Sequence, residues 1–73
     1  MEAAPKYALT ARVEEEIELL KRHMLIFRLV LEKQPIGIIK LSELTKLPQH
    51  RVRYSLRVLE HEGLIKPSPQ GAI

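Results

Sequence analysis

Side chains that can recognise a polyanion are concentrated in one short stretch of the chain. Between residues 46 and 58 there are four Lys/Arg residues and no Asp or Glu. Arginine can donate two hydrogen bonds to guanine O6 and N7, and glutamine can pair with adenine. The candidate binding residues in this stretch and beside it are Gln49, His50, Arg51, Arg53, Lys40, Lys46, Tyr54, Arg57 and Lys66.

The rest of the charge distribution agrees with this concentration. The 73-residue chain has a formal net charge of +3. Residues 1–39 contain six Lys/Arg and six Glu, whereas residues 40–73 contain six Lys/Arg and three Glu. The whole positive excess therefore lies in the C-terminal half. A run of charge is usually only a solvated helix face, so the elements that carry it must be considered next.

The basic stretch is expected to form a helix over residues 49–62. Val52, Leu56 and Leu59 recur at i, i+4 and i+7, which predicts one buried stripe. At about 100° per residue, the opposite side of this helix carries His50, Tyr54, Arg57 and His61, with Arg51 and Arg53 on its two edges. Pro48 is suited to open the helix, and Gly63 to end it.

Short elements are expected on both sides of this helix. Ile36–Ile39 is β-branched and predicts a short strand, and residues 41–46 predict a short helix with Leu41 and Leu44 facing inward. After Gly63, residues 64–66 predict a strand, and residues 68–71 form a turn with proline at its second position. Ala72 and Ile73 could begin a return strand.

A long N-terminal helix is predicted over about residues 11–34, preceded by a flexible tail of residues 1–10. Thr10 is a suitable N-cap, and Gln34-Pro35 ends the helix because the residue before proline avoids the helical region. Apolar residues repeat along this helix at spacings of 4, 3, 4, 3 and 4, and we call them the heptad seam. The heptad seam consists of Val13, Ile17, Leu20, Met24, Phe27 and Leu31.

The long helix has more apolar residues than the heptad seam. Leu19, Ile26 and Val30 lie off the seam, so a second face needs cover. These three residues are predicted to form the interface of a homodimer. The alternative is a monomer in which the tail folds back over that face.

The order of these elements resembles that of a winged helix-turn-helix domain. The stretch from Leu41 to Ile65, ending in Leu-Glu-His-Glu-Gly-Leu-Ile, is similar to the helix-turn-helix of small archaeal and bacterial transcriptional regulators. The resemblance covers residues 11–73 and implies a mostly helical α+β fold with a very short wing at 64–73. It implies binding of double-stranded DNA, with helix 49–62 in the major groove and half-sites about 34 Å apart for a dimer. The resemblance places Gln49, His50, Arg51 and Arg53 near bases. It places Lys40, Lys46, Tyr54, Arg57 and Lys66 at phosphates. A protein-interaction module in a transcription or replication complex is the alternative, since fold alone does not settle function.

Other classes of function find little support in the composition. The chain has no Cys and no Asp, so most catalytic sets cannot be assembled, and no enzyme activity or cofactor is expected. His50 and His61 are about 16 Å apart along one helix, too far for one metal ion.

No apolar run reaches the ~20 residues of a membrane span, and a cytoplasmic protein is expected. The absence of Asn and Cys hints at a thermophilic source.

Overall fold

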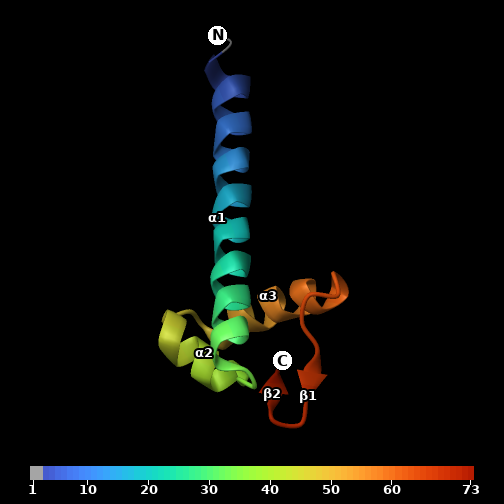
Figure 1. Ribbon diagram of the computed structural model, residues 1–73. Helices are drawn as coiled ribbons and strands as arrows, with labels where there is room; N and C mark the ends of the chain where they lie inside the picture. The colour runs from blue at the N-terminus through green and yellow to red at the C-terminus, as the bar shows by residue number, and fades with distance from the viewer. Residues whose placement is uncertain (1–2) are drawn as a thin grey trace.

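Three helices and one small sheet make up the fold. The computed structural model describes residues 3–73, with side chains from Thr10 onward. The elements are α1 (Ala3–Lys33), α2 (Ile38–Thr45), α3 (Gln49–His61), β1 (Pro67–Ser68) and β2 (Gly71–Ala72). The expected mostly helical α+β class is confirmed. Figure 1 shows α1 as a long rod that carries the other elements around its C-terminal end, in a molecule of 54 × 24 × 18 Å.

The N-terminal tail was predicted incorrectly, because α1 begins at Ala3 and not near residue 11. Thr10 is consequently an interior helical residue and not an N-cap. Alanine has the highest helix propensity, so Ala3 and Ala4 favour an early start. Pro5 is compatible with that start because the first turn of a helix needs no backbone N–H from proline. Residues 1–2 lie outside the described part of the chain. The predicted end is confirmed, since α1 ends at Lys33.

The strand predicted for Ile36–Ile39 is wrong except at its first residue. Ile36 forms an isolated antiparallel bridge with Ala72, through N–O distances of 3.1 Å and 2.8 Å. Gly37 is the N-cap of α2, and Ile38 and Ile39 are already helical. The β-branched run indicated a strand, but the backbone N–H of Leu41 bonds to the carbonyl of Gly37 and closes a helical turn instead.

A tight turn joins α2 to α3. Lys46 is left-handed, with φ 61° and ψ 24°, and its N–H bonds to the carbonyl of Ser42. The Thr45 hydroxyl donates to the carbonyl of Leu41 (2.7 Å) and accepts from the Leu47 N–H (3.2 Å). These short-range bonds hold the turn without the glycine that a left-handed residue usually requires.

The end of α3 follows the prediction. Gly63 has φ +77° and its N–H bonds to the carbonyl of Glu60, while the Leu64 N–H bonds to the carbonyl of Leu59. This pair of bonds is the Schellman arrangement that commonly ends helices. It turns the chain back so that Ile65 is buried, with 3% of its surface exposed.

The C-terminal hairpin is as short as expected but begins later. The strand predicted for residues 64–66 is instead β1, Pro67–Ser68, which pairs antiparallel with β2 through Pro67–Ala72 and Ser68–Gly71. Gly71 has φ +131°, and a Cβ there would lie 2.5 Å from the carbonyl carbon of Ile36. The hairpin therefore packs directly against the backbone between α1 and α2.

The core consists of one small apolar cluster from all parts of the fold. Its members are Ile26, Val30, Ile36, Leu41, Val52, Leu59, Ile65 and Ala72. Leu56 packs partly against it, as expected for α3. Leu41 faces inward as predicted, whereas Leu44 does not, since 41% of it is exposed.

The predicted dimer-interface residues are mostly core residues. Ile26 and Val30 are 0% and 1% exposed, and Leu19 is half-buried. Ile26 and Val30 cannot contact a second copy, because they pack in the core cluster with residues of α2, α3 and the hairpin. Most of the heptad seam lies in solvent instead, with 44% to 61% of Val13, Ile17, Leu20, Met24 and Leu31 exposed. The face predicted to need a partner is thus largely buried in the core, and most of the heptad seam is exposed.

Candidate nucleic-acid interface

Helix α3 separates a buried stripe from a basic, exposed face. Val52, Ser55 and Leu59 are buried against the core. About half a turn away around the helix lie the side chains that we call the α3 basic face. The α3 basic face consists of His50, Arg51, Arg53, Tyr54, Arg57 and His61, all of them exposed.

The three arginines of this face are not engaged by acidic partners. Among the side chains described from Thr10 onward, the ion pairs are Lys21–Glu18 (3.6 Å) and His61–Glu62 (3.8 Å). The first turn of α3 contains no acidic residue. An unpaired guanidinium keeps all of its hydrogen-bond donors available for an external acceptor. The geometry thus offers several free donors along one side of α3.

The lysines and glutamine predicted from the sequence lie on neighbouring elements. Gln49 is the first residue of α3 and is exposed, at the end where helical N–H groups favour anions. Lys40 is exposed in the first turn of α2, and Lys46 is exposed in the turn before α3. Lys66 is exposed just before β1, where its backbone pairs with Ile73 through bonds of 2.7 Å and 2.9 Å. All nine predicted residues are therefore accessible to solvent.

A buried polar pair connects α1 to α3 beneath the basic face. His23 Nδ1 lies 2.8 Å from Ser55 Oγ, with His23 8% exposed and Ser55 0% exposed. The His23 ring also lies beside the Tyr54 ring, with 5.8 Å between centroids. Burial and, to a smaller extent, the neighbouring Arg22 charge lower the pKa of His23 below 6.5. The neutral imidazole is therefore favoured, and its hydrogen bond with Ser55 joins α1 to α3.

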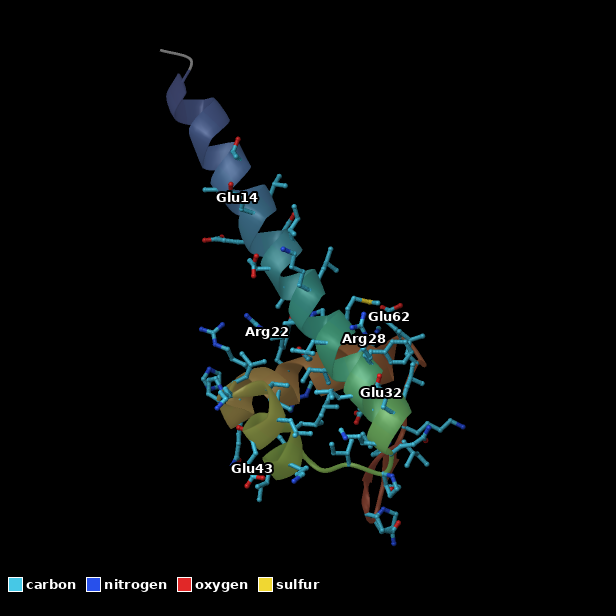
Figure 2. The ribbon with its side chains drawn as sticks, turned by 60° about the vertical axis from the view of Figure 1, so that its left-hand side comes forward. Glu14, Arg22, Arg28, Glu32, Glu43 and Glu62 are labelled. Atoms are coloured by element: carbon cyan, nitrogen blue, oxygen red, sulfur yellow. The ribbon has the colours of Figure 1, made fainter. Side chains whose placement is uncertain are left out.

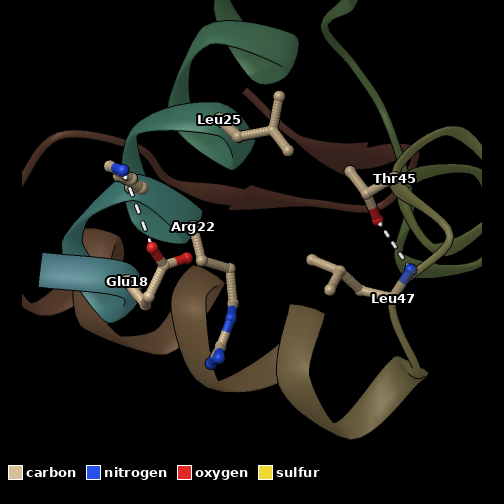
Figure 3. Close-up of a pocket in the computed structure, with 6 residues that line it drawn as sticks. Glu18, Arg22, Leu25, Thr45 and Leu47 are labelled. Atoms are coloured by element: carbon tan, nitrogen blue, oxygen red, sulfur yellow. Dashed lines mark hydrogen bonds and ion pairs between the residues drawn. The ribbon is translucent and has the colours of Figure 1, made fainter. Parts of the chain in front are cut away.

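A shallow pocket opens between α1 and the turn that joins α2 to α3. Figure 3 shows Glu18, Arg22 and Leu25 of α1 on one side and Thr45 and Leu47 on the other. Glu18 is already paired with Lys21, and the Thr45 hydroxyl is used by the turn. Two of the polar side chains that line the pocket therefore already have partners within the chain.

No group of three His, Cys, Asp or Glu in the described part of the chain could hold a metal ion. No helix within residues 3–73 is long and apolar enough to cross a membrane.

Two structural determinants were missed by the sequence reasoning. The first is Ser55, a polar residue in the stripe of α3 that packs on α1, together with its partner His23. The spacing of His23, Ile26 and Val30 predicts a second buried stripe on α1. The stripe is recognised only when a histidine is accepted as one of its buried residues. The second is the close approach of Gly71 to Ile36, since the sequence placed Gly71 only in the predicted turn 68–71.

Comparisons with known proteins identify no relative of this chain. No protein-family model matches it, and neither a curated protein nor a solved structure shows significant similarity to it.

Proposed function

We propose that this chain is a winged helix-turn-helix protein that binds double-stranded DNA and acts as a transcriptional regulator. The observation that carries the proposal is the α3 basic face. Three exposed arginines, without acidic partners among the described side chains, lie opposite the stripe that fixes α3 to the core. An α-helix of about 10–12 Å diameter fits the DNA major groove, which is about 12 Å wide.

The order of elements supports the same proposal. A helix, an extended residue at Ile36, a helix, a tight turn, a second helix and a hairpin follow one another along the chain. This is the order that the resemblance to winged-helix regulators implies. The hairpin is short, so Lys66 at its base is the one wing residue assigned a phosphate contact.

Within the proposal the residues have two kinds of role. Gln49, His50, Arg51 and Arg53 lie toward the N-terminal end of α3 and read base edges, as recognition helices do. The remaining residues contact phosphates and hold the helix in register without reading sequence. Those phosphate contacts are assigned to Lys40, Lys46, Tyr54, Arg57 and Lys66. The functional unit is a homodimer formed through α1.

The test is titration of the protein into a labelled duplex at several salt concentrations, followed by fluorescence anisotropy. The logarithm of the binding constant should fall linearly with the logarithm of salt, with a slope of about −0.9 per neutralised phosphate. Arg53→Ala/Arg57→Ala should weaken binding at least tenfold, because a base contact contributes about 1–3 kcal/mol. The same double change should make the slope shallower by about one for each phosphate contact that is lost.

The matched control removes the same charge from another part of the chain. Arg12→Ala/Lys33→Ala lies entirely on α1 and should change affinity by much less. Equal losses in the two double variants would mean that only net charge attracts DNA. No loss in Arg53→Ala/Arg57→Ala would eliminate α3 as the recognition helix.

One observation favours a second function. The exposed heptad seam is a surface on which a different protein could dock, which would make the chain an interaction module of a transcription or replication complex. Absence of duplex binding even at low salt, together with a monomeric chain, would support this function over the first.

A further inference from the structure

The free half of α1 presents an apolar surface that nothing in the described chain covers. Figure 1 shows α1 extending well beyond the elements packed at its C-terminal end. Val13, Ile17, Leu20 and Met24 are between 44% and 61% exposed along this half, and Leu31 continues the same line at 56%. Contiguous exposed apolar residues of this extent are uncommon on monomers and indicate an interaction surface.

The heptad seam and the packed stripe can be occupied at the same time. His23, Ile26 and Val30 face the domain, and at about 100° per residue the seam lies roughly a third of a turn away around α1. Phe27 is the seam residue nearest the packed stripe, and it is half-buried against the core. A second helix can therefore pack on the seam without displacing α2, α3 or the hairpin.

The charge of α1 reverses along its length. Residues 10–20 contain one arginine and four glutamates, for a net charge of −3. Residues 21–33 contain four Lys/Arg and one glutamate, for a net charge of +3. Figure 2 shows Glu14 on the free part of α1 and Arg28 close to the packed domain. One half of α1 is thus electrostatically complementary to the other half.

We infer that two copies of the chain associate through the heptad seam with their α1 helices antiparallel. The inference deepens the proposed function, on which it rests for the role of the dimer, by assigning the partner surface and its direction. The seam spacings of 4, 3, 4, 3 and 4 read the same from either end. An antiparallel pair centred near residue 22 therefore places Leu20 against the partner's Met24 and Val13 against the partner's Leu31.

The flanking charges select the antiparallel direction. Glu14 and Arg28 lie two heptads apart on the same edge of the seam. In the antiparallel pair, Glu14 and the partner's Arg28 are offset by only about 3 Å along the helix axis, and this contact occurs twice per dimer. In a parallel pair the same two residues are offset by about 21 Å along the axis. A parallel pair also has two attractions, one between Glu16 of each copy and the Lys21 of the other. It also brings the glutamates of both copies to the same level, which is unfavourable.

The antiparallel direction has one internal cost. Lys21 lies near the centre of the pair and approaches the partner's Lys21. Glu18 lies 3.6 Å from Lys21 and offsets part of that repulsion. In the antiparallel pair, the two-fold axis is perpendicular to both helices, so both domains lie on the same side of the helix pair.

Both copies of α3 therefore lie on one side of the dimer, where they can bind the same DNA duplex.

The first experiment uses the absence of cysteine from the chain. A Val13→Cys chain is mixed with a Leu31→Cys chain, and the mixture is oxidised under native conditions. The mixed disulfide should be the main product, because Val13 faces the partner's Leu31. Predominant cross-linking of the Val13→Cys chain to itself would mean a parallel pair and would overturn the inference.

The second experiment is a charge-reversal cycle followed by sedimentation equilibrium. Wild-type protein should sediment at twice the 8.4 kDa of the chain. Glu14→Arg and Arg28→Glu should each raise the dimer dissociation constant severalfold, and the double variant should restore it. Leu20→Glu should give a monomer that still unfolds cooperatively when followed by circular dichroism, as expected if the core is intact. A monomeric wild type, or no rescue in the double variant, would overturn the inference.

These results separate the dimer from DNA binding. Arg53→Ala/Arg57→Ala should still sediment as a dimer, because both residues lie on α3 and away from the seam. Leu20→Glu should still bind DNA, with lower affinity and a shallower salt slope. A dimer without affinity for DNA would refute the proposed function alone, and a monomer that binds DNA fully would refute the antiparallel pair alone.

Discussion

The two halves of α1 have the same backbone geometry but different surroundings. Residues 10–20 extend from the domain into solvent, whereas residues 21–33 supply His23, Ile26 and Val30 to its core. Both halves carry apolar residues at helical spacing. The comparison shows that an amphipathic pattern is sufficient to predict a helix but does not specify which face is buried.

The buried half has the denser apolar sequence, but residue type alone does not decide which of its side chains are buried. Ile17 and Ile26 are the same residue type in the same helix, yet they are 44% and 0% exposed. What differs is the opposing surface, where His23 and Ser55 share a hydrogen bond and the core cluster packs around Ile26. Burial of a polar group is tolerated when its hydrogen bond is satisfied.

The largest effect expected from this comparison is on the stability of the packed half. Ile26→Ala should lower the free energy of unfolding by about 2–5 kcal/mol, because it leaves a cavity in a small core. Ile17→Ala should change it by less than about 0.5 kcal/mol when measured at a concentration where the chain is monomeric. Urea unfolding followed by circular dichroism compares the two.

If Ile26→Ala does not fold, a milder change in the same position replaces it. Ile26→Val should cost about 1 kcal/mol and leave a measurable transition. Equal losses at positions 17 and 26 would show that the free half of α1 is packed in solution and would remove the contrast between the halves.

The contact between the hairpin and the packed half should be nearly as sensitive. Gly71→Ala would place a Cβ 2.6 Å from the carbonyl oxygen of Ile36 at a φ of +131°. The expected loss is about 2–4 kcal/mol, from backbone strain and overpacking together. Gly37→Ala is the matched control, since a Cβ there meets nothing within 4 Å. A loss at Gly71 no greater than at Gly37 would mean that the hairpin is not held against Ile36.

A smaller effect is expected from the protonation of His23. The folded state lowers the pKa of His23 below 6.5, so the unfolded chain binds a proton more readily. The stabilisation is therefore complete above pH 6.5 and decreases as the pH falls through that value. Urea midpoints measured between about pH 5 and pH 7.5 should show the decrease.

Two variants show whether His23 is responsible for that decrease. His23→Gln should remove this part of the pH dependence, because the amide does not titrate in that range. His50→Gln removes an exposed histidine instead and should leave the decrease in place. An unchanged pH profile in His23→Gln would contradict the assignment.

The smallest effect is expected on the free half of α1. Lys21 and Glu18 form an i, i+3 pair at 3.6 Å, with about 70% of each side chain exposed. Glu18→Gln should change the stability of the monomer by no more than about 0.5 kcal/mol, because water screens such pairs. A thermal unfolding scan is sufficient, and a loss comparable to that of Gly71→Ala would mean that this half is packed after all.

Much of the fold was accessible from local sequence signals. Gly63 predicted the end of α3 because glycine adopts positive φ without a Cβ penalty, and Pro48 predicted its start. The stripe of Val52, Leu56 and Leu59 predicted the buried side of α3, and hence its exposed arginines. These features depend on neighbours within one or two turns of the chain.

The errors arose where local preference competed with distant contacts. The β-branched run at Ile36–Ile39 indicated a strand, but the chain had only one partner residue for it, Ala72, and the rest formed α2. The surplus apolar surface of α1 was recognised, but the face that became buried was predicted to bind a partner, because His23 interrupted its stripe.

By itself, the amino-acid sequence determined the helices, the turn signals and the concentration of positive charge on one side of α3. Those properties follow from propensity, periodicity and charge count along a continuous segment. Only the tertiary structure decided which face of α1 enters the core, where the hairpin meets the chain, and that the heptad seam is left exposed. Those outcomes depend on residues far apart in sequence, such as His23 with Ser55 and Gly71 with Ile36, whose fit is a matter of shape and hydrogen bonding in three dimensions.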